Sequence, residues 1–226
     1  MLNDSFDEIL RKEKALDAEV LNIWGENAFL DGITCYEKFI KAKYRILWIL
    51  KEVNNTNNKE KEHNRRKYHY SVQGSKTFYN IMRVCYAIFN SIEKYDKKLL
   101  AISKDECLIN DSIVLDEIAI INVKKSGGNS ITIPGSIDRE YKKQGVKQFL
   151  MKQIDFINPH IIINSSRVLQ LYKDLCNDNY SKINGELYSI YNNRLIIDTG
   201  HPLMAPTKYY CDQILKIVFE NINKIN

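Results

Sequence analysis

Polar residues follow several short apolar runs in this chain, and three of them have side chains suited to chemistry on a planar ring. Glu52 comes two residues after the apolar run 46–50, Asn122 directly follows another run, and His201 stands in a Gly-His-Pro turn. A carboxylate can act as a general base, and a histidine can donate or accept a proton near neutral pH. An asparagine amide offers a donor and an acceptor to the edge of a base.

These residues need a scaffold that brings the strand ends together. The apolar runs do not alternate with polar residues, which is typical of strands buried on both faces. Strands are predicted at 45–50, 117–123, 160–163, 187–191 and 194–197, the last two turned at Asn192-Asn193. Helical spacing of apolar residues predicts helices over 5–24, 35–42, 77–92, 140–156, 166–176 and 206–222.

The order of these elements predicts an α/β fold with three layers, in which helices cover both faces of a central sheet. We expect that sheet to be mostly parallel and to contain four to five strands. Loops at the carboxyl ends of parallel strands line the ligand crevice of such folds. A length of 226 residues fits a single domain over 1–226, with an N-terminal helical segment, 1–43, packed on it.

Composition sets further limits. Lys and Arg number 33 against 28 Asp and Glu, a net charge of +5 that permits a nucleic-acid partner without demanding one. The five cysteines are odd in number and show no C-x-x-C spacing, which favours reduced thiols in a cytoplasmic protein. We expect no metal, no cofactor and no membrane span, and a monomeric protein.

Two polar stretches are predicted to be loops that meet the ligand. The first, 51–76, holds a cationic run and Tyr70, which could stack on a ring. The second, 124–139, holds two glycines that let a backbone approach closely. The predicted phosphate contacts in these loops and after the third strand are Arg65, Arg66, Lys67, Lys124, Lys125, Ser126, Gly127, Gly128, Ser165 and Ser166.

The order of the motifs resembles that of the uracil-DNA glycosylase superfamily. In that family a strand ends in G-x-D-P-Y or G-x-N-P-G, whose third residue helps to activate water. Residues 50–54 here read Leu-Lys-Glu-Val-Asn, which places Glu52 at that position. Residues 70–73, Tyr-Ser-Val-Gln, are similar to the family's Phe-Ser-Val-Gln, and an Asn-Ile pair follows at 80–81.

Two later motifs extend the resemblance. Asn122 ends a strand as the family's base-reading asparagine does, and residues 201–204, His-Pro-Leu-Met, are similar to the family's His-Pro-Ser. The Gly and Pro of the first motif are Leu50 and Val53 here, the Ser of the last is Leu203, and the cysteines of the iron–sulfur branches are missing. These departures mark a divergent member.

The resemblance implies a monofunctional DNA glycosylase that hydrolyses the N-glycosidic bond of a flipped-out base. The base would be uracil or another modified base, including a phage-hypermodified one, in repair or anti-phage defence. Glu52 would activate water and His201, kept neutral, would donate to the departing base. The implied base-binding residues are Asn122, Tyr70 and Asn54, and the residues filling the vacated stack would be Leu203 or Met204.

Other interpretations stay open. The chain could be a catalytically inactive nucleic-acid-binding module of the same fold, as the missing Gly, Pro and Ser suggest. It could also hydrolyse free nucleosides or a small metabolite. Taken singly, Glu52 could be a solvated loop carboxylate, and Asn122 could cap a turn. The identity of the base and the strandedness of the DNA are not predicted.

Overall fold

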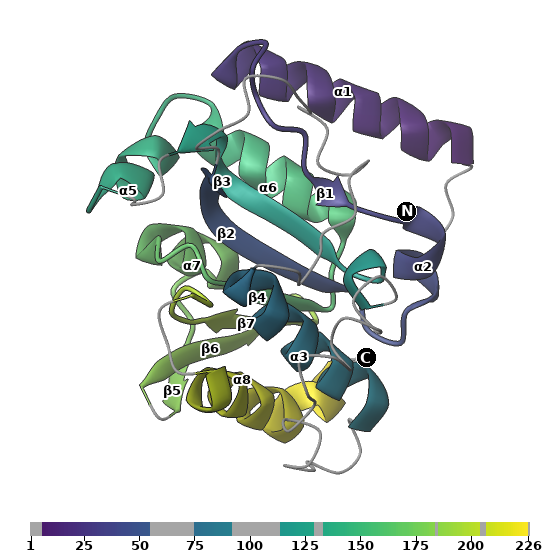
Figure 1. Cartoon of the computed structure of the whole chain (residues 1–226), viewed down its shortest axis with the longest axis vertical. Helices are drawn as coiled ribbons and strands as arrows, with labels where there is room; N and C mark the ends of the chain where they lie inside the picture. Colours follow the sequence, from purple (N-terminus) through teal and green to yellow (C-terminus); the bar gives the residue numbers. More distant parts are fainter. Residues whose placement is uncertain are drawn as a thin grey trace.

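A computed structural model of the chain describes residues 6–54, 75–91, 114–128, 133–183, 185–203 and 207–225. Within these residues one mixed sheet has seven strands in the order β1-β3-β2-β4-β7-β6-β5 (Figure 1). The strands are β1 (Gly32–Ile33), β2 (Ile46–Asn54), β3 (Ala119–Gly128), β4 (Ile161–Asn164), β5 (Ser181–Ile183), β6 (Glu186–Tyr191) and β7 (Arg194–Asp198).

The centre of the sheet is parallel, as predicted. Strands β3, β2, β4 and β7 pair parallel with their neighbours, whereas β1, β6 and β5 add antiparallel strands at the two edges. The hairpin between β6 and β7 was predicted, and Asn192 and Asn193 both adopt the positive φ that its tight turn requires. The prediction of an α/β fold with a mostly parallel core is therefore confirmed, although the sheet is wider than the sequence indicates.

Helices pack on both faces of the sheet. They are α1 (Phe6–Trp24), α2 (Tyr36–Lys41), α3 (Lys76–Ser91), α5 (Ser136–Tyr141), α6 (Val146–Ile157), α7 (Leu169–Cys176) and α8 (Thr207–Asn221), which the 3-10 turn η2 (Ile222–Lys224) follows. The helix predicted over 140–156 corresponds to α6, which begins only at Val146 because the chain turns at Gly145 with a φ of 82°. Most of α5 lies in the stretch 124–139, which was predicted to be a loop. No helix among the described residues is long and apolar enough to cross a membrane.

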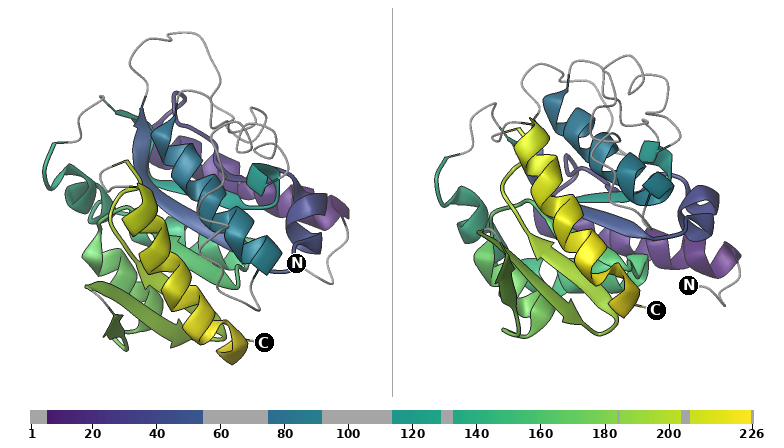
Figure 2. Two further views of the ribbon diagram at one scale, coloured as in Figure 1. Left: turned by 60° about the horizontal axis from the view of Figure 1, so that its bottom comes forward. Right: turned by 90° about the horizontal axis from the view of Figure 1, so that it is seen from below.

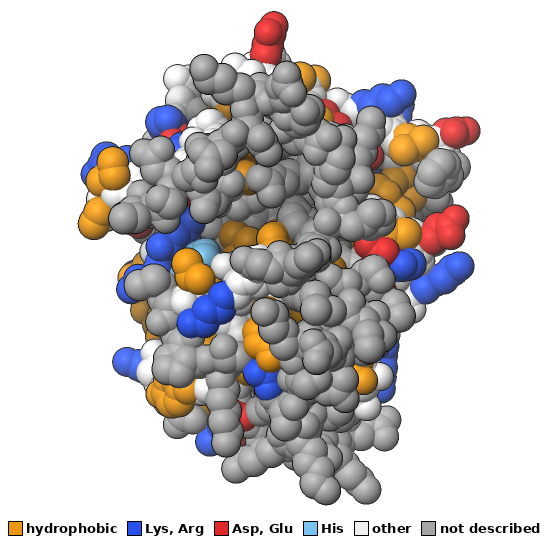
Figure 3. Space-filling model, viewed as in Figure 1, with side chains coloured by type: hydrophobic (Ala, Val, Ile, Leu, Met, Phe, Trp, Pro, Cys, Tyr) orange, Lys and Arg blue, Asp and Glu red, His pale blue; other side chains and the backbone are white. Residues whose placement is uncertain are grey.

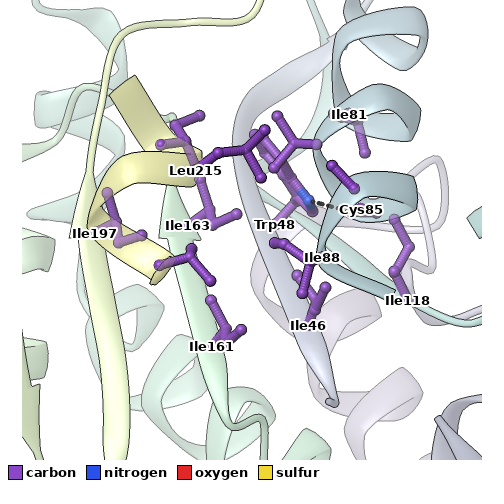
Figure 4. Packing of buried hydrophobic residues seen from close by; sticks show 14 of the residues in the cluster. Ile46, Trp48, Ile81, Cys85, Ile88, Ile118, Ile161, Ile163, Ile197 and Leu215 are labelled. Carbon is purple, nitrogen blue, oxygen red and sulfur yellow. Dashed lines mark hydrogen bonds between the residues drawn. The ribbon is translucent and has the colours of Figure 1, made fainter. Parts of the chain in front are cut away.

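Alternate residues of β2 contribute to two separate cores. Ile46, Trp48 and Leu50 pack with α3 and α8 on one face, where those two helices lie side by side (Figure 2). Figure 4 shows this core, in which the Trp48 indole donates to Cys85 Sγ at 3.2 Å. Leu47 and Ile49 face the other core, which α1, α6 and α7 complete. Burial on both faces explains why the run does not alternate.

Strands β2 and β3 continue beyond their predicted ends. The stretch 124–128 was predicted as loop, but it is strand, and Val53 and Asn54 of β2 pair with Gly127 and Gly128. Glu52 pairs with Lys124, so two residues of β3 have no partner across the strand at this point. A bulge of this kind twists the strand and redirects its side chains. The prediction of a loop at 124–128 was wrong because polar residues of this stretch pair with β2 and bind carboxylates of the same protein.

Candidate functional site

The sheet has a topological switch point between β2 and β4. The chain leaves β2 through α3 on one face to reach β3, and it leaves β4 through α7 on the other face (Figures 1 and 2). In open α/β sheets ligands bind outside the carboxyl ends of the strands at such a point. The ends of β2 and β4 are therefore the place to look for a site.

Three strand ends lie side by side there. Ile49 of β2 is opposite Asn164 of β4, and the Ser165 amide donates to the Ile49 carbonyl at 2.8 Å. Asn164 in turn lies opposite Asp198 of β7, and the Thr199 amide donates to the Asn164 carbonyl at 2.9 Å. This register brings the residues that follow each strand to one edge. The prediction that polar strand ends meet is confirmed for these three strands.

Glu52 is held in a defined position at this edge. Its side chain is only 8% exposed, and its Oε2 lies 2.7 Å from the Lys124 ammonium of β3. A Cβ at Gly128 would come within 2.2 Å of Glu52 Cδ, so the carboxylate lies against the backbone of that glycine. Lys124, predicted to contact phosphate, is engaged with Glu52 and 3.4 Å from the Gly127 carbonyl.

His201 follows β7 and is kept neutral. Burial, together with the positive charges of Lys51 and Arg167, lowers the pKa of His201 to about 4. The Leu203 amide donates to Nδ1 at 3.3 Å, so the neutral ring carries its proton on Nε2. The buried Asn80 of α3 fixes the loop, because its Nδ2 donates to the Pro202 carbonyl at 2.6 Å.

Lys51 and Arg167 form a pair of cations beside His201. Burial and the charge of Arg167 lower the pKa of Lys51. Within the described part of the chain, neither side chain takes part in an ion pair. No role was predicted for Arg167. Its position four residues after the predicted third strand, at the start of the predicted helix 166–176, is the signal that could have identified it.

Buried side-chain hydrogen bonds fix the loop that carries Arg167. Asn164 donates from Nδ2 to Asp198 Oδ1 and accepts at Oδ1 from the Ser166 hydroxyl, both at 2.6 Å. The Ser165 hydroxyl lies 3.0 Å from the Tyr210 hydroxyl. Ser165 and Ser166 are fully buried, so in this conformation they support the loop and do not present a surface to DNA.

Asp198 is partly buried beneath the same loop. Burial is the main cause that raises its pKa, to about 7, and the nearby Glu186 carboxylate acts in the same direction. The hydrogen bond from Asn164 opposes this shift. Asp198 is thus a carboxyl that titrates near neutral pH at the carboxyl edge, which the sequence analysis did not single out.

Asn122 and Lys125 are buried, and their side chains bind another residue of the protein. Both bind the buried Asp31 carboxylate. Lys125 Nζ lies 2.5 Å from Asp31 Oδ1. Asn122 donates to Asp31 Oδ2 from its backbone N–H at 2.7 Å and from Nδ2 at 3.1 Å. Gln153 of α6 closes the network with bonds to Asp31 and Lys125. Lys125 has no exposed side-chain surface, so it does not reach a phosphate in this conformation.

The other predicted site residues divide into two groups. Leu203 is 49% exposed, Ser126 is half-buried and Gly127 is exposed near the end of β3. Those outside the described residues are Arg65, Arg66, Lys67, Tyr70 and Met204, and of Asn54 only the backbone is described.

The described residues at the carboxyl edge of the sheet offer charged and polar side chains for chemistry. In the part of the chain that the structure describes, no group of three or more His, Cys, Asp or Glu is placed to hold a metal ion. On the face seen in Figure 3, Lys and Arg side chains lie above and below a histidine that hydrophobic side chains border. Neither a scan against protein-family models nor a search of curated protein sequences found a match.

Proposed function

We propose that this chain is a DNA base glycosylase that acts on a modified base. The observation that carries the proposal is that the parallel strands β2 and β7 bring two groups to one edge of the sheet: the Glu52 carboxylate, held by Lys124, and a neutral His201 whose Nε2 carries a proton. The proposal includes the finer fold assignment, a single three-layer domain like that of the uracil-DNA glycosylases. It also includes a monomeric protein that acts on DNA in the cytoplasm.

The reaction separates charge in a way that suits these two groups. The bond between the sugar C1′ and the base nitrogen breaks, and its electron pair leaves with the base. Positive charge develops on the sugar and negative charge on the base. A carboxylate at Glu52 stabilises the sugar cation and orients the water whose oxygen bonds to C1′. The proton released by that water balances the negative charge of the departing base.

His201 is suited to the other half of the reaction. A neutral imidazole that donates from Nε2 stabilises negative charge on the base without giving up a proton. Burial, together with the charges of Lys51 and Arg167, lowers the pKa of His201 and keeps the ring neutral down to about pH 4, which supports this role. Leu203, exposed two residues later, is placed to enter the space that a flipped base leaves.

A second candidate function is a nucleic-acid-binding module without catalysis. Two observations favour it: Glu52 is paired with Lys124, and Asn122 is bound to the buried Asp31 instead of facing a ligand. In this alternative the edge binds DNA, but no carboxylate activates water.

Base release from a panel of DNA substrates separates the two. The panel contains uracil, hypoxanthine, xanthine, 5-hydroxymethyluracil and glucosylated hydroxymethylcytosine, and mass spectrometry detects the free base. We expect release of one base by the native protein, and loss of that release in Glu52→Gln and His201→Ala. Glu220→Gln, which changes an exposed carboxylate on α8, is the matched control and keeps activity.

The opposite result is equally clear. If no base is released from any substrate while DNA binding stays strong and weakens steeply with salt, the glycosylase proposal fails and the binding module is supported. If neither release nor binding is found, both proposals fail.

A further inference from the structure

Two cations at the switch point form no ion pair among the described residues, and the one carboxylate that acts on either of them is that of Glu52, next to Lys51 in the chain. Lys51 lies near the end of β2 and Arg167 in the loop after β4, and the two strands are direct neighbours. Each acts electrostatically on His201, which places the three groups in one cluster. Like charges repel when they are held together, and an anion placed between them removes that repulsion.

The fold holds the two cations on one side of the sheet. Side chains alternate along a strand, so Lys51 projects to the face that Ile49 shares with α7, and Glu52 to the face of Leu50. Arg167 directly precedes α7 and has a positive φ of 63°. The backbone on both sides of it is fixed, because the Ser166 amide donates to Asn164 Oδ1 and the Val168 amide donates to the Ser166 hydroxyl oxygen.

We infer that Lys51 and Arg167 form a subsite for a phosphate group, with His201 at its edge. A guanidinium presents paired N–H donors that match two phosphate oxygens, and an ammonium adds a compact charge. Arg167 is exposed and Lys51 is half-buried, so a ligand can reach both. The serines and the glycines that the sequence indicated for phosphate binding do not form this subsite.

Two sources could supply the phosphate. The inference rests on the proposed function for its choice, which is a phosphodiester of the DNA strand next to the bound nucleotide. A mononucleotide would present the same chemistry as a phosphate monoester. Because the carboxylate of Glu52 lies on the opposite face from Lys51, the phosphate and the reacting sugar do not compete for one position.

The test measures binding without requiring catalysis. The probe is a short oligonucleotide with a tetrahydrofuran abasic analogue, which has no glycosidic bond to cleave and needs no knowledge of the base. Inorganic phosphate and a deoxynucleoside 5′-monophosphate are the other arms. The variants are Lys51→Gln and Arg167→Gln, and the matched controls are Lys216→Gln on α8 and Arg11→Gln on α1, both exposed.

Two measurements report on the subsite: the affinity for the oligonucleotide with its salt dependence, and the titration of His201. The affinity for the oligonucleotide should fall about tenfold in each variant, and the slope of log affinity against log salt should become shallower by about 1. Nitrogen NMR of labelled histidine, assigned with His201→Asn, follows the ring. In the free protein each variant should raise the pKa of His201, because a neighbouring positive charge has been removed.

The outcomes decide between the sources. Binding of the oligonucleotide that shifts the His201 resonances and depends on both cations supports the DNA phosphate. A shift caused by the monophosphate alone overturns that choice and assigns the subsite to a nucleotide. If affinity and salt slope in both variants match those of Lys216→Gln and Arg11→Gln, there is no phosphate subsite. That result leaves the glycosylase proposal standing, since base release is measured separately.

Discussion

The Glu52 carboxylate lies directly against Gly128, across the extended pairing of β2 and β3. A Cβ on residue 128 would come within 2.2 Å of both Cδ and Oε2 of Glu52. The glycine therefore makes room for a carboxylate of the same protein, where the sequence predicted a close approach to phosphate. The Lys124 ammonium also binds this carboxylate, with its Nζ 2.7 Å from Glu52 Oε2. Glycine and lysine together determine where the proposed catalytic group sits.

Gly128→Ala should therefore displace Glu52 without unfolding the protein. The atoms that clash belong to the end of a flexible side chain, so we expect a stability loss of only about 1 kcal/mol in urea unfolding. Base release should fall toward the level of Glu52→Gln. Gly200→Ala is the control for stability, because its new Cβ meets nothing within 4 Å. Full activity in Gly128→Ala would show that the position of Glu52 is not needed.

A second prediction concerns the buried pair of Lys125 and Asp31. Lys125→Met leaves a fully buried carboxylate without its cation, which costs about 3–5 kcal/mol of unfolding free energy. Adding Asp31→Asn should recover much of that loss, because the uncompensated charge disappears. Lys152→Met, on α6, removes an exposed ion pair with Glu19 and should cost less than about 1 kcal/mol.

Denaturant titration of the native protein, the two single variants and the double variant forms the corresponding double-mutant cycle. Lys152→Met is titrated beside them as the exposed control. A cost for Lys125→Met no greater than that for Lys152→Met would mean that the buried pair contributes nothing to stability. Lys125 lies within the bulge of β3, where the strand has no partner in β2.

The parts of the fold that could be predicted are those with local patterns. Unbroken apolar runs identified the parallel strands, and helical spacing identified the described helices other than α5. The hairpin at Asn192-Asn193 follows from turn chemistry alone. The outermost strands β1 and β5 were not predicted, because runs of two and three residues are too short to carry a period.

The candidate site was predicted only as far as its strand ends. Glu52 and His201 could be identified because each follows a buried run, and the exposed Leu203 because it follows His201. Lys125 was assigned to the surface because its partner Asp31 is 94 residues earlier in the chain, beyond any local pattern. The bond between Asn122 and Asp31 was not predicted for the same reason. Charge pairs formed between distant segments decide which polar residues face inward.

A third prediction follows from the neutral state of His201. Its pKa in the folded protein is about 4, below the ordinary value of 6.5. Between these values the unfolded chain binds a proton that the folded chain does not bind, so stability falls as the pH falls through this window. His201→Asn removes this proton. The native protein should therefore lose about 1–2 kcal/mol more than the variant between about pH 7 and pH 4.

Urea unfolding of both proteins across that range measures the difference. The comparison is internal, because a constant effect of the substitution cancels and only the pH-dependent part remains. Equal pH profiles for the native protein and His201→Asn would mean that the ring titrates normally. In base release, a neutral His201 predicts no loss of activity from this group until the pH approaches about 4.

Asp198 gives a prediction of the opposite sign. Its pKa is raised from 3.8 to about 7, mainly by burial. Between these values the unfolded chain has released a proton that the folded chain still holds, so Asp198 reduces stability as the pH rises through the window. Asp198→Asn keeps an oxygen that can accept the hydrogen bond from Asn164 and has no charge to bury. The variant should be about 1–2 kcal/mol more stable than the native protein at about pH 8, and equally stable at about pH 4.

The control for this prediction is Asp155→Asn, which changes an exposed carboxylate paired with Arg194. It should change stability by less than about 1 kcal/mol and should not become stabilising as the pH rises. A native protein that is more stable than Asp198→Asn at about pH 8 would show that the ionised carboxylate is a favourable partner of Asn164. The loop that carries Arg167 would then depend on a charge, and phosphate binding would weaken when that charge is removed.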